Sequence, residues 1–128
     1  MIPKFRFFGK VADGAMRMVS ADCIDFKNGF IYYSYHGYTV EGGDHVYGDT
    51  IGFEDCVLMQ STGLFDKNSK EIFEGDIVRF HTPQLTTIGV VEFDKNEGCF
   101  KVRNDFGGHY VTMFHTRYFE VIGNIYQL

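Results

Sequence analysis

The sequence predicts a mainly β protein, and three observations support this fold class. Valine, isoleucine, phenylalanine, tyrosine and threonine account for 50 of the 128 residues, against 3 alanines and 4 leucines. Branched and aromatic side chains suit a pleated, half-buried surface, whereas alanine and leucine favour helices. Glycine occurs 15 times and proline twice. Short apolar stretches also recur roughly every ten residues between turn-forming residues, which is typical of short strands joined by tight turns.

Two β-hairpins are expected in an N-terminal part, residues 1–52. The first turns at Asn28-Gly29, because both residue types tolerate the positive φ that a two-residue hairpin turn requires. The second turns at the polar, glycine-containing residues 41–44. The expected strands of this part cover residues 4–8, 16–26, 30–33, 38–40 and 45–47.

The remaining residues, 53–128, are expected to form a C-terminal part that folds as a small SH3-like β-barrel. Short strand-like stretches alternate here with turns such as Lys95–Gly98 and Gly107-Gly108. Four or five short strands at this spacing fit a small barrel. The expected strands cover residues 63–65, 71–73, 77–80, 89–93, 99–102, 110–114 and 120–126.

Charge and hydropathy exclude several classes of protein. The net charge is −5, which disfavours a strongly basic nucleic-acid-binding protein. Hydrophobic residues make up 45% and charged residues 23%, as in an ordinary globular domain, so intrinsic disorder is not expected. No apolar stretch approaches the ~20 residues of a membrane-spanning helix. Residues 1–4 lead directly into a strand-like segment, so no secretory signal is expected either.

The three cysteines are Cys23, Cys56 and Cys99, and their spacing does not match a metal-ligand pattern. We expect free thiols in an intracellular protein, with a single disulfide or a reactive thiol as the alternatives. The neighbours of Cys23 and Cys99 are apolar, which indicates core surroundings for both. Such surroundings raise the pKa of a thiol.

Acidic side chains concentrate in the middle of the chain, where residues 53–76 carry six acidic and two basic groups. Asp66 and Asn68 fit the first two ligand positions of a calcium-binding EF-hand loop. Lys70 then stands where a third ligand is needed, and Ile77 replaces the bidentate glutamate, so the match fails. We interpret the cluster as two turns whose side chains accept local backbone hydrogen bonds. Its members are Asp66, Asn68, Glu71, Glu74 and Asp76.

Two short motifs have both a structural and a chemical interpretation. Asp76 is a candidate general base, but we favour a structural role in which Gly75 supplies an unusual backbone angle. Asp76 then accepts backbone N–H groups where the strand 77–80 begins. Gly123-Asn124 likewise indicates a bulge in the last strand rather than a catalytic group.

The histidines show no metal-binding pattern. No two have the i, i+4 spacing of a helical zinc site, and no cysteine lies within four residues of any of them. We expect solvated or half-buried side chains. The histidines are His36, His45, His81, His109 and His115.

The 22 aromatic residues are more than a single small core readily holds. In Phe7-Phe8 and Tyr32-Tyr33 the two neighbours point to opposite faces of a strand, so one of each pair is expected to face outward. Outward aromatic rings stack on nucleic-acid bases or fill protein interfaces. Because basic clusters are lacking, we favour a protein interface. The aromatic residues that would serve nucleic-acid binding are Phe80, Phe93 and Phe100.

Several segments, in their order and spacing, resemble the YopX-like family of small phage and prophage proteins. They are Met1–Arg6, Met59–Asn68, Lys70–Val78, Gly89–Phe93 and Val121–Tyr126. The resemblance implies a β-rich fold with a distinct N-terminal part and a barrel-like C-terminal part. It also implies no established activity, so no catalytic residue is carried over.

One position departs from the family pattern. Members often have glycine where this chain has Ser69, in the turn after Asp66-Lys67-Asn68. Glycine there would relieve strain at a positive φ. Either Asn68 adopts that conformation in this chain, or the turn differs.

We therefore assign no catalytic, cofactor-binding or metal-ligating residue, and we expect a non-catalytic accessory protein of a phage or prophage. It is expected to act by protein contact in the cytoplasm of the bacterial host. The expected partners are further copies of the chain and an unidentified host or phage protein, with no membrane. The alternative is a nucleic-acid-binding module built on a small β-barrel. A hydrolase or metal enzyme has little support.

Overall fold

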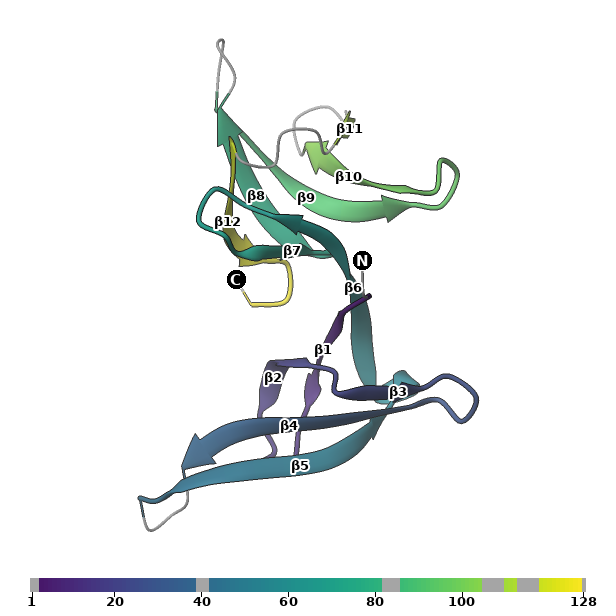
Figure 1. The fold of residues 1–128 in the computed structure, drawn as a ribbon, viewed down its shortest axis with the longest axis vertical. Coiled ribbons are helices and arrows are strands. Elements are labelled where there is room, and N and C mark those ends of the chain that lie inside the picture. The colour runs from purple at the N-terminus through teal and green to yellow at the C-terminus, as the bar shows by residue number, and fades with distance from the viewer. Residues whose placement is uncertain (1–2, 39–41, 82–85, 105–109, 113–117, 128) are drawn as a thin grey trace. The chain divides into compact units, whose positions relative to one another are not determined.

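The structure, a computed structural model, describes residues 3–38, 42–81, 86–104, 110–112 and 118–127 (Figure 1). Regular structure in these ranges is almost entirely β-strand, together with a 3-10 turn, η1 (Phe53–Asp55). The mainly β class is therefore confirmed. Residues 4–59 form one compact unit, the N-terminal unit, and residues 60–128 with 1–3 form the C-terminal unit. The expected division at residue 53 stays a prediction.

Antiparallel strands make up the N-terminal unit. One sheet has the order β3-β4-β5, and a second has the order β2-β1-β6-β7, in which β6 runs on into the C-terminal unit. Figure 1 shows β4 and β5 as a long, curved hairpin. The strands of this unit are β1 (Phe5–Lys10), β2 (Met16–Ser20), β3 (Cys23–Asp25), β4 (Phe30–Tyr38), β5 (Asp44–Gly52) and the first residues of β6 (Cys56–Phe65).

The first expected hairpin is present, but its turn is longer than two residues. Asp25 pairs with Phe30, so residues 26–29 form the turn. The Asp25 carboxylate accepts hydrogen bonds from the backbone N–H of Asn28, at 3.0 Å, and from its side-chain amide, at 2.8 Å. Only Gly29 adopts a positive φ, of 76°. The carboxylate thus fixes a turn with one left-handed residue, in place of the expected turn with two.

The second expected hairpin joins β4 to β5, and its strands are longer than expected. The pairing runs without a shift from Phe30 opposite Gly52 to Tyr38 opposite Asp44. The expected strand over residues 16–26 is instead broken at residues 21–22 into β2 and β3. The strand character of residues 56–62 was not expected, since only 63–65 were assigned to a strand.

The core of the N-terminal unit lies between the β4–β5 hairpin and β1 and β2. Phe7 and Ile31 are fully buried, and Tyr33 is nearly so. Burial of one such side chain contributes roughly 1.5–3 kcal/mol relative to exposure. Tyr33 is buried while its neighbour Tyr32 is 46% exposed. The expectation that one of this pair faces outward is confirmed. The buried core residues are Phe7, Val11, Val19, Ile31, Tyr33 and Ile51.

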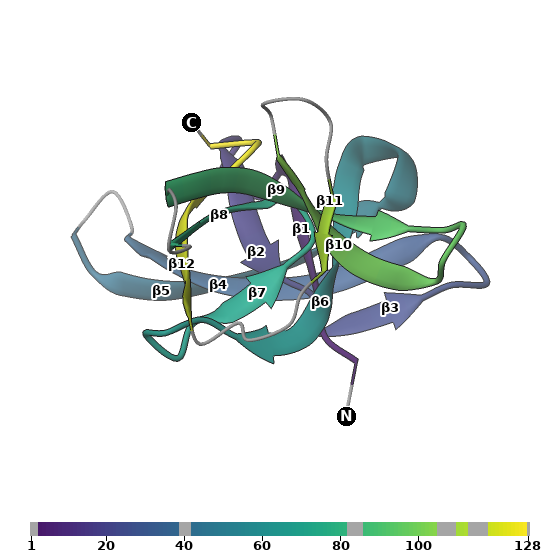
Figure 2. The ribbon, with the colours of Figure 1, turned by 90° about the horizontal axis from the view of Figure 1, so that it is seen from above.

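The C-terminal unit is built on a five-stranded sheet with the order β11-β10-β9-β8-β12. Figures 1 and 2 show β9 curving strongly, so that the sheet curls into a half-barrel. A shift in register between Val121 and Gly123 confirms the bulge expected in the last strand. The strands are β8 (Asp76–His81), β9 (Thr86–Asp94), β10 (Cys99–Asn104), β11 (Tyr110–Thr112) and β12 (Phe119–Asn124), with β7 (Glu71–Phe73) paired to the second half of β6.

Alternate residues of these strands form the core of the C-terminal unit. Val78, Val91 and Val102 are fully buried, and the rings of Phe80 and Phe119 pack against each other with centroids 5.0 Å apart. Residues 113 and 114, expected at the end of a strand, lie outside the described residues. The buried core residues are Ile72, Val78, Phe80, Val91, Val102 and Phe119.

Candidate functional site

Carboxylates of the acidic cluster, residues 66–76, stabilise the C-terminal unit by accepting hydrogen bonds from the backbone. Asp66 is 6% exposed, and its carboxylate accepts backbone N–H groups from Asn68 and Lys70, each at 2.8 Å, and from Val121 at 2.9 Å. Burial raises the pKa of Asp66, but these three hydrogen bonds and the charge of Lys70 outweigh it, so the pKa lies below its usual value. The interpretation of Asp66 as a turn-capping residue is confirmed.

Asp76 also serves structure. It is 1% exposed, and its carboxylate accepts the backbone N–H of Phe73 at 2.8 Å, at the point where β8 begins. Gly75 has a φ of 87°. Both parts of the structural interpretation are therefore confirmed. Because the Asp76 carboxylate is enclosed, a substrate has no direct approach to it.

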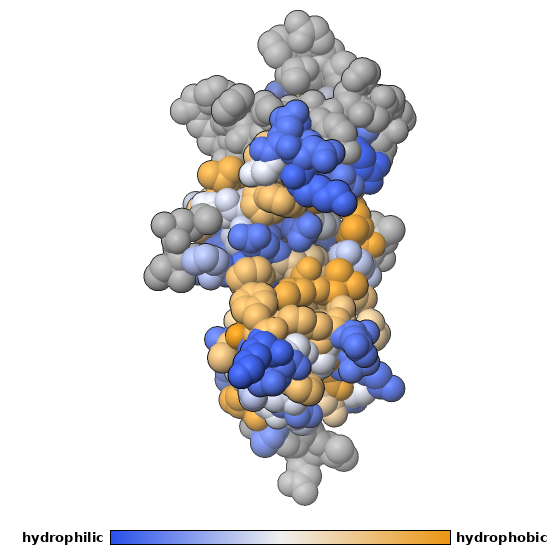
Figure 3. Space-filling model, turned by 90° about the vertical axis from the view of Figure 1, so that its right-hand side faces the viewer, coloured by the Kyte–Doolittle hydropathy of each residue, from blue (hydrophilic) through white to orange (hydrophobic). Residues whose placement is uncertain are grey.

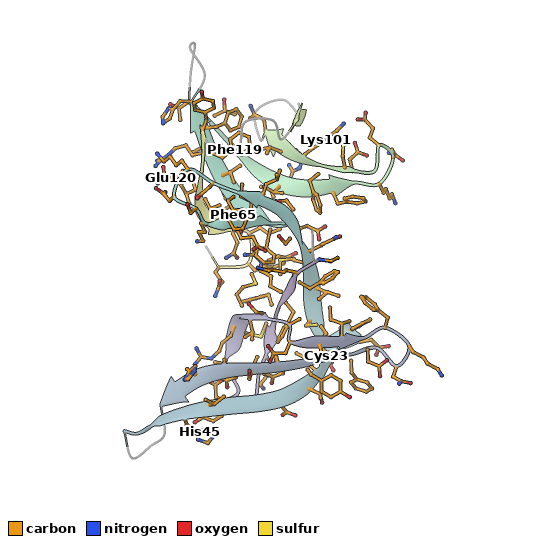
Figure 4. All side chains as sticks on the ribbon, viewed as in Figure 1. Cys23, His45, Phe65, Lys101, Phe119 and Glu120 are labelled. Carbon is orange, nitrogen blue, oxygen red and sulfur yellow. The ribbon has the colours of Figure 1, made fainter. Side chains whose placement is uncertain are left out.

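Histidines and cysteines lie apart in the N-terminal unit. Figure 4 shows His45 near the tip of the β4–β5 hairpin and Cys23 at the other end of that sheet. Across the described ranges, no three His, Cys, Asp or Glu side chains come together in a way that could hold a metal ion. His36, His45 and His81 are exposed. His109 and His115 lie outside the described residues.

The prediction that Cys23 and Cys99 lie in core surroundings is wrong. Cys23 and Cys99 are both exposed. Each begins a strand, and the following residue, Ile24 or Phe100, packs against a core instead. Alternation along a strand then turns the cysteine outward. Cys56 is partly buried, and burial raises the pKa of its thiol, to which the nearby Asp55 carboxylate adds.

Aromatic rings gather on the surface of the N-terminal unit around the β3–β4 turn. Phe26 is 66% exposed, and its ring meets Phe5 and Phe53 edge to face, with centroids 6.2 and 6.0 Å away. Phe30 is 46% exposed. Figure 3 shows apolar side chains, in orange and tan, on the face of this unit that carries the turn. We call Phe5, Phe26, Phe30 and Phe53 the aromatic surface.

A pocket of about 460 Å³ opens beside these rings. Its walls come from the β3–β4 turn and from η1. The two are joined by a hydrogen bond in which the backbone N–H of Phe53 donates to the Gly29 carbonyl oxygen at 2.9 Å. The volume falls within the range of roughly 300–1,000 Å³ that is usual for ligand sites. The lining residues are Asn28, Gly29, Phe30, Gly52, Phe53, Glu54 and Asp55.

Two carboxylates give the pocket its charge. Glu54 and Asp55 are exposed, and neither forms a hydrogen bond or an ion pair through its side chain with the described part of the chain. A Cβ at Gly52 would lie 3.3 Å from Asp55 Oδ2. Asp55 therefore sits over a residue without a side chain, and its carboxylate stays open to the pocket. The arrangement offers aromatic faces and negative charge to one ligand.

Sequence reasoning did not identify this pocket. Its two halves, residues 28–30 and 52–55, are separated by more than twenty residues, and the pairing of Phe30 with Gly52 brings them together. A signal was present in Phe53-Glu54-Asp55, where two acidic residues follow an aromatic one directly after the expected hairpin. The register of β4 and β5 was needed to relate this segment to Asn28-Gly29.

The aromatic residues named for nucleic-acid stacking are only partly accessible. Phe80 is buried, so its ring is not exposed for stacking on a base. Phe93 is 45% exposed and packs edge to face on Phe100, with centroids 5.2 Å apart. The nearby Lys101 ammonium contacts Asp94 at 3.2 Å and Glu97 at 2.7 Å. These ion pairs leave this lysine poorly placed for phosphate.

Within the described ranges, no helix has the length and hydropathy needed to cross a membrane.

Comparison with known proteins identifies the family of this chain and solved structures that are similar to it. The model of the YopX protein family matches residues 4–128. The crystal structure of protein EF1440 from Enterococcus faecalis is similar, with a TM-score of 0.60 and 26% sequence identity over 98% of this chain and 94% of that one. No curated protein matches the chain. Because the family model covers nearly its whole length, the chain belongs to the YopX family.

Proposed function

We propose that this protein is a non-catalytic accessory protein of a phage or prophage that acts by binding another protein. The aromatic surface of the N-terminal unit carries the proposal. Phe26 and Phe30 are large apolar side chains that remain 66% and 46% exposed, beside a pocket lined partly by Phe53. Clustered exposed aromatic rings are typical of protein interfaces, where they supply much of the binding energy.

The proposed setting is the cytoplasm of a bacterial host, and it follows from the family resemblance. The proposed partners are an unidentified host or phage protein and further copies of the chain. Sedimentation at high protein concentration tests the second partner, since a strict monomer would remove self-association from the proposal. The half-barrel is proposed to be SH3-like, which its five antiparallel strands in one curled sheet support.

Affinity capture of the tagged full-length chain from its bacterial host tests the proposal. The capture is run with and without nuclease, for the wild type and for Phe26→Ser. We expect a protein partner that survives nuclease and is lost with Phe26→Ser. The matched control is Phe93→Ser, which removes an exposed aromatic ring from the C-terminal unit and should leave the capture unchanged.

Two results would contradict this proposal. A set of partners that disappears with nuclease would favour the alternative, a nucleic-acid-binding module. A partner retained equally by Phe26→Ser and by the wild type would show that the aromatic surface is not the contact site.

The proposed division of the chain at residue 53 is tested by limited proteolysis. If the first cut in the full-length chain falls close to residue 53, the two parts fold as separate units. A first cut elsewhere, with residues 50–60 protected, would contradict it. Protease cuts first where the backbone is exposed and weakly held.

A further inference from the structure

We propose that the pocket beside the aromatic surface binds an arginine side chain of the partner protein. This inference rests on the proposed function and names the chemistry of the contact. Three features carry it: the size of the pocket, the aromatic rings in its walls, and the two carboxylates that have no protein partner among the described residues.

The negative charge of the pocket favours a positively charged ligand. Glu54 and Asp55 both line it, and its other lining residues are uncharged. Residues 4–59 as a whole carry eight acidic and five basic side chains, so the unit attracts positive charge. Asp25, which is close in sequence to the pocket, is already bound by the backbone and side chain of Asn28. Glu54 and Asp55 are therefore the carboxylates free to bind a ligand.

The aromatic walls select among cations. A metal ion needs several ligand side chains, and the described residues contain no group of three that could hold one. A guanidinium is planar, stacks on aromatic rings and donates two parallel hydrogen bonds to one carboxylate. Phe30 and Phe53 offer rings in the same pocket as Asp55 and Glu54. This combination suits arginine better than the compact, strongly hydrated ammonium of lysine.

The pocket is held in shape before any ligand arrives. The Asp25 carboxylate fixes the turn at Asn28, and Phe53 N–H to the Gly29 carbonyl oxygen, at 2.9 Å, ties η1 to that turn. Gly52 leaves space under Asp55, because a Cβ there would lie 3.3 Å from Asp55 Oδ2. A preformed site loses less conformational entropy on binding.

Binding is measured by NMR on the isotope-labelled full-length chain, titrated with acetyl-Gly-Leu-Arg-Leu-Gly-amide at millimolar concentration. We expect shifts of backbone amides at residues 28–30 and 52–55. The same peptide with citrulline, which keeps the shape of arginine but not its charge, should bind about tenfold more weakly or worse. The peptide with lysine should bind more weakly than the arginine peptide.

Variants of the chain identify the groups involved. Asp55→Asn and Glu54→Gln should each weaken binding of the arginine peptide several-fold. Asp49→Asn is the matched control: it removes one exposed charge from the same unit at a residue that does not line the pocket, and it should leave the affinity unchanged. Equal binding of the arginine and citrulline peptides, shifts confined to other residues, or no binding at millimolar peptide would overturn the inference.

These outcomes separate this inference from the proposed function. A partner captured from the host that is lost with Phe26→Ser, while the arginine peptide does not bind, would leave the proposed function standing and reject the arginine site. Binding of the arginine peptide at the pocket, without any nuclease-resistant partner in the host, would support the site and reject the proposed function.

Discussion

The C-terminal unit buries polar side chains, whereas among its described residues the N-terminal unit buries only apolar and aromatic ones. Asp66, Asp76 and Lys101 are all less than 9% exposed, and all lie after residue 60. In the N-terminal unit, carboxylates such as Asp13, Glu54 and Asp55 are exposed. Among the residues whose burial the structure describes, the buried polar ones are Ser61, Thr62, Asp66, Asp76, Thr87 and Lys101.

This difference shows two uses of the same residue types. In the C-terminal unit, buried carboxylates accept backbone N–H groups and hold turns against strands, as Asp66 holds the 66–70 turn to β12. Such groups are costly to disturb because their partners are enclosed. In the N-terminal unit, the core is apolar and the carboxylates and some rings remain at the surface. Of these carboxylates, Glu54 and Asp55 have no side-chain partner in the described part of the chain, so they are available for binding without loss of the fold.

The largest expected effect contrasts a buried and an exposed phenylalanine within the N-terminal unit. Phe7 is fully buried, so Phe7→Ala should lower the free energy of unfolding by about 3–5 kcal/mol. Phe26 is 66% exposed, so Phe26→Ala should lower it by less than about 1 kcal/mol. Urea unfolding followed by tyrosine fluorescence measures both. Similar losses would mean that the aromatic surface serves folding rather than binding.

The next largest effect is expected at the buried Asp66 carboxylate of the C-terminal unit. Asp66→Asn replaces one acceptor oxygen by an NH2 group that cannot accept a backbone N–H, so the free energy of unfolding should fall by about 1–3 kcal/mol. Asp13→Asn is the control, because Asp13 forms an exposed ion pair with Arg17. It should have the smaller effect on urea unfolding at neutral pH. A larger effect of Asp13→Asn would reverse the comparison between the units.

Acid should remove the contribution of Asp66. The pKa of Asp66 lies below its usual value in the folded protein, so its ionised form is favoured by folding. The stabilisation is therefore complete above the unfolded pKa of about 3.9 and is lost as the pH falls through the folded pKa. The difference in urea midpoint between wild type and Asp66→Asn should shrink below about pH 4. A difference that stays constant with pH would show that Asp66 does not titrate in this way.

A glycine comparison sharpens the contrast in packing. A Cβ at Gly89 would lie 2.6 Å from the Arg103 carbonyl oxygen and from Val102 Cγ1, so Gly89→Ala should cost about 1–3 kcal/mol. At Gly37 the nearest atom is Tyr47 Cε2, at 2.8 Å, which belongs to a side chain, whereas the contact at Gly89 includes backbone. Gly37→Ala should therefore cost less in thermal unfolding. Equal costs would indicate that the β4–β5 hairpin is as tightly packed as β9 and β10.

The smallest effect is a gain in stability. Ser69 is the only residue other than glycine with a positive φ in the described ranges, at 63°. Ser69→Gly should raise the free energy of unfolding by about 0.5–1 kcal/mol, because glycine adopts this conformation without steric cost. Asn68 lacks a positive φ, so Asn68→Gly should lower stability instead. A loss on Ser69→Gly would mean that the serine side chain itself supports the turn.

Ser69 also shows how far a family pattern can be interpreted without a structure. The sequence offered two explanations for the missing glycine: a positive φ at Asn68, or a different turn. Instead, Ser69 adopts the positive φ itself. The turn is held by Asp66, which accepts N–H groups from Asn68 and Lys70, and by Ser69 N–H donating to the Asp66 carbonyl oxygen at 3.0 Å. These three hydrogen bonds fix the backbone whichever residue stands at position 69.

The sequence by itself determined the β class, the hairpin at Asn28-Gly29, the structural role of Asp76 at the start of β8, and the bulge near Gly123. Each depends on residues that are close in the chain, where turn chemistry and alternation act directly. Only the tertiary structure decided that Cys23 and Cys99 face outward, that Phe80 is buried, and that residues 28–30 meet 52–55 in one pocket. These outcomes depend on strand register and on which face of a sheet is covered. Register is set by pairing between distant segments, which local patterns do not specify.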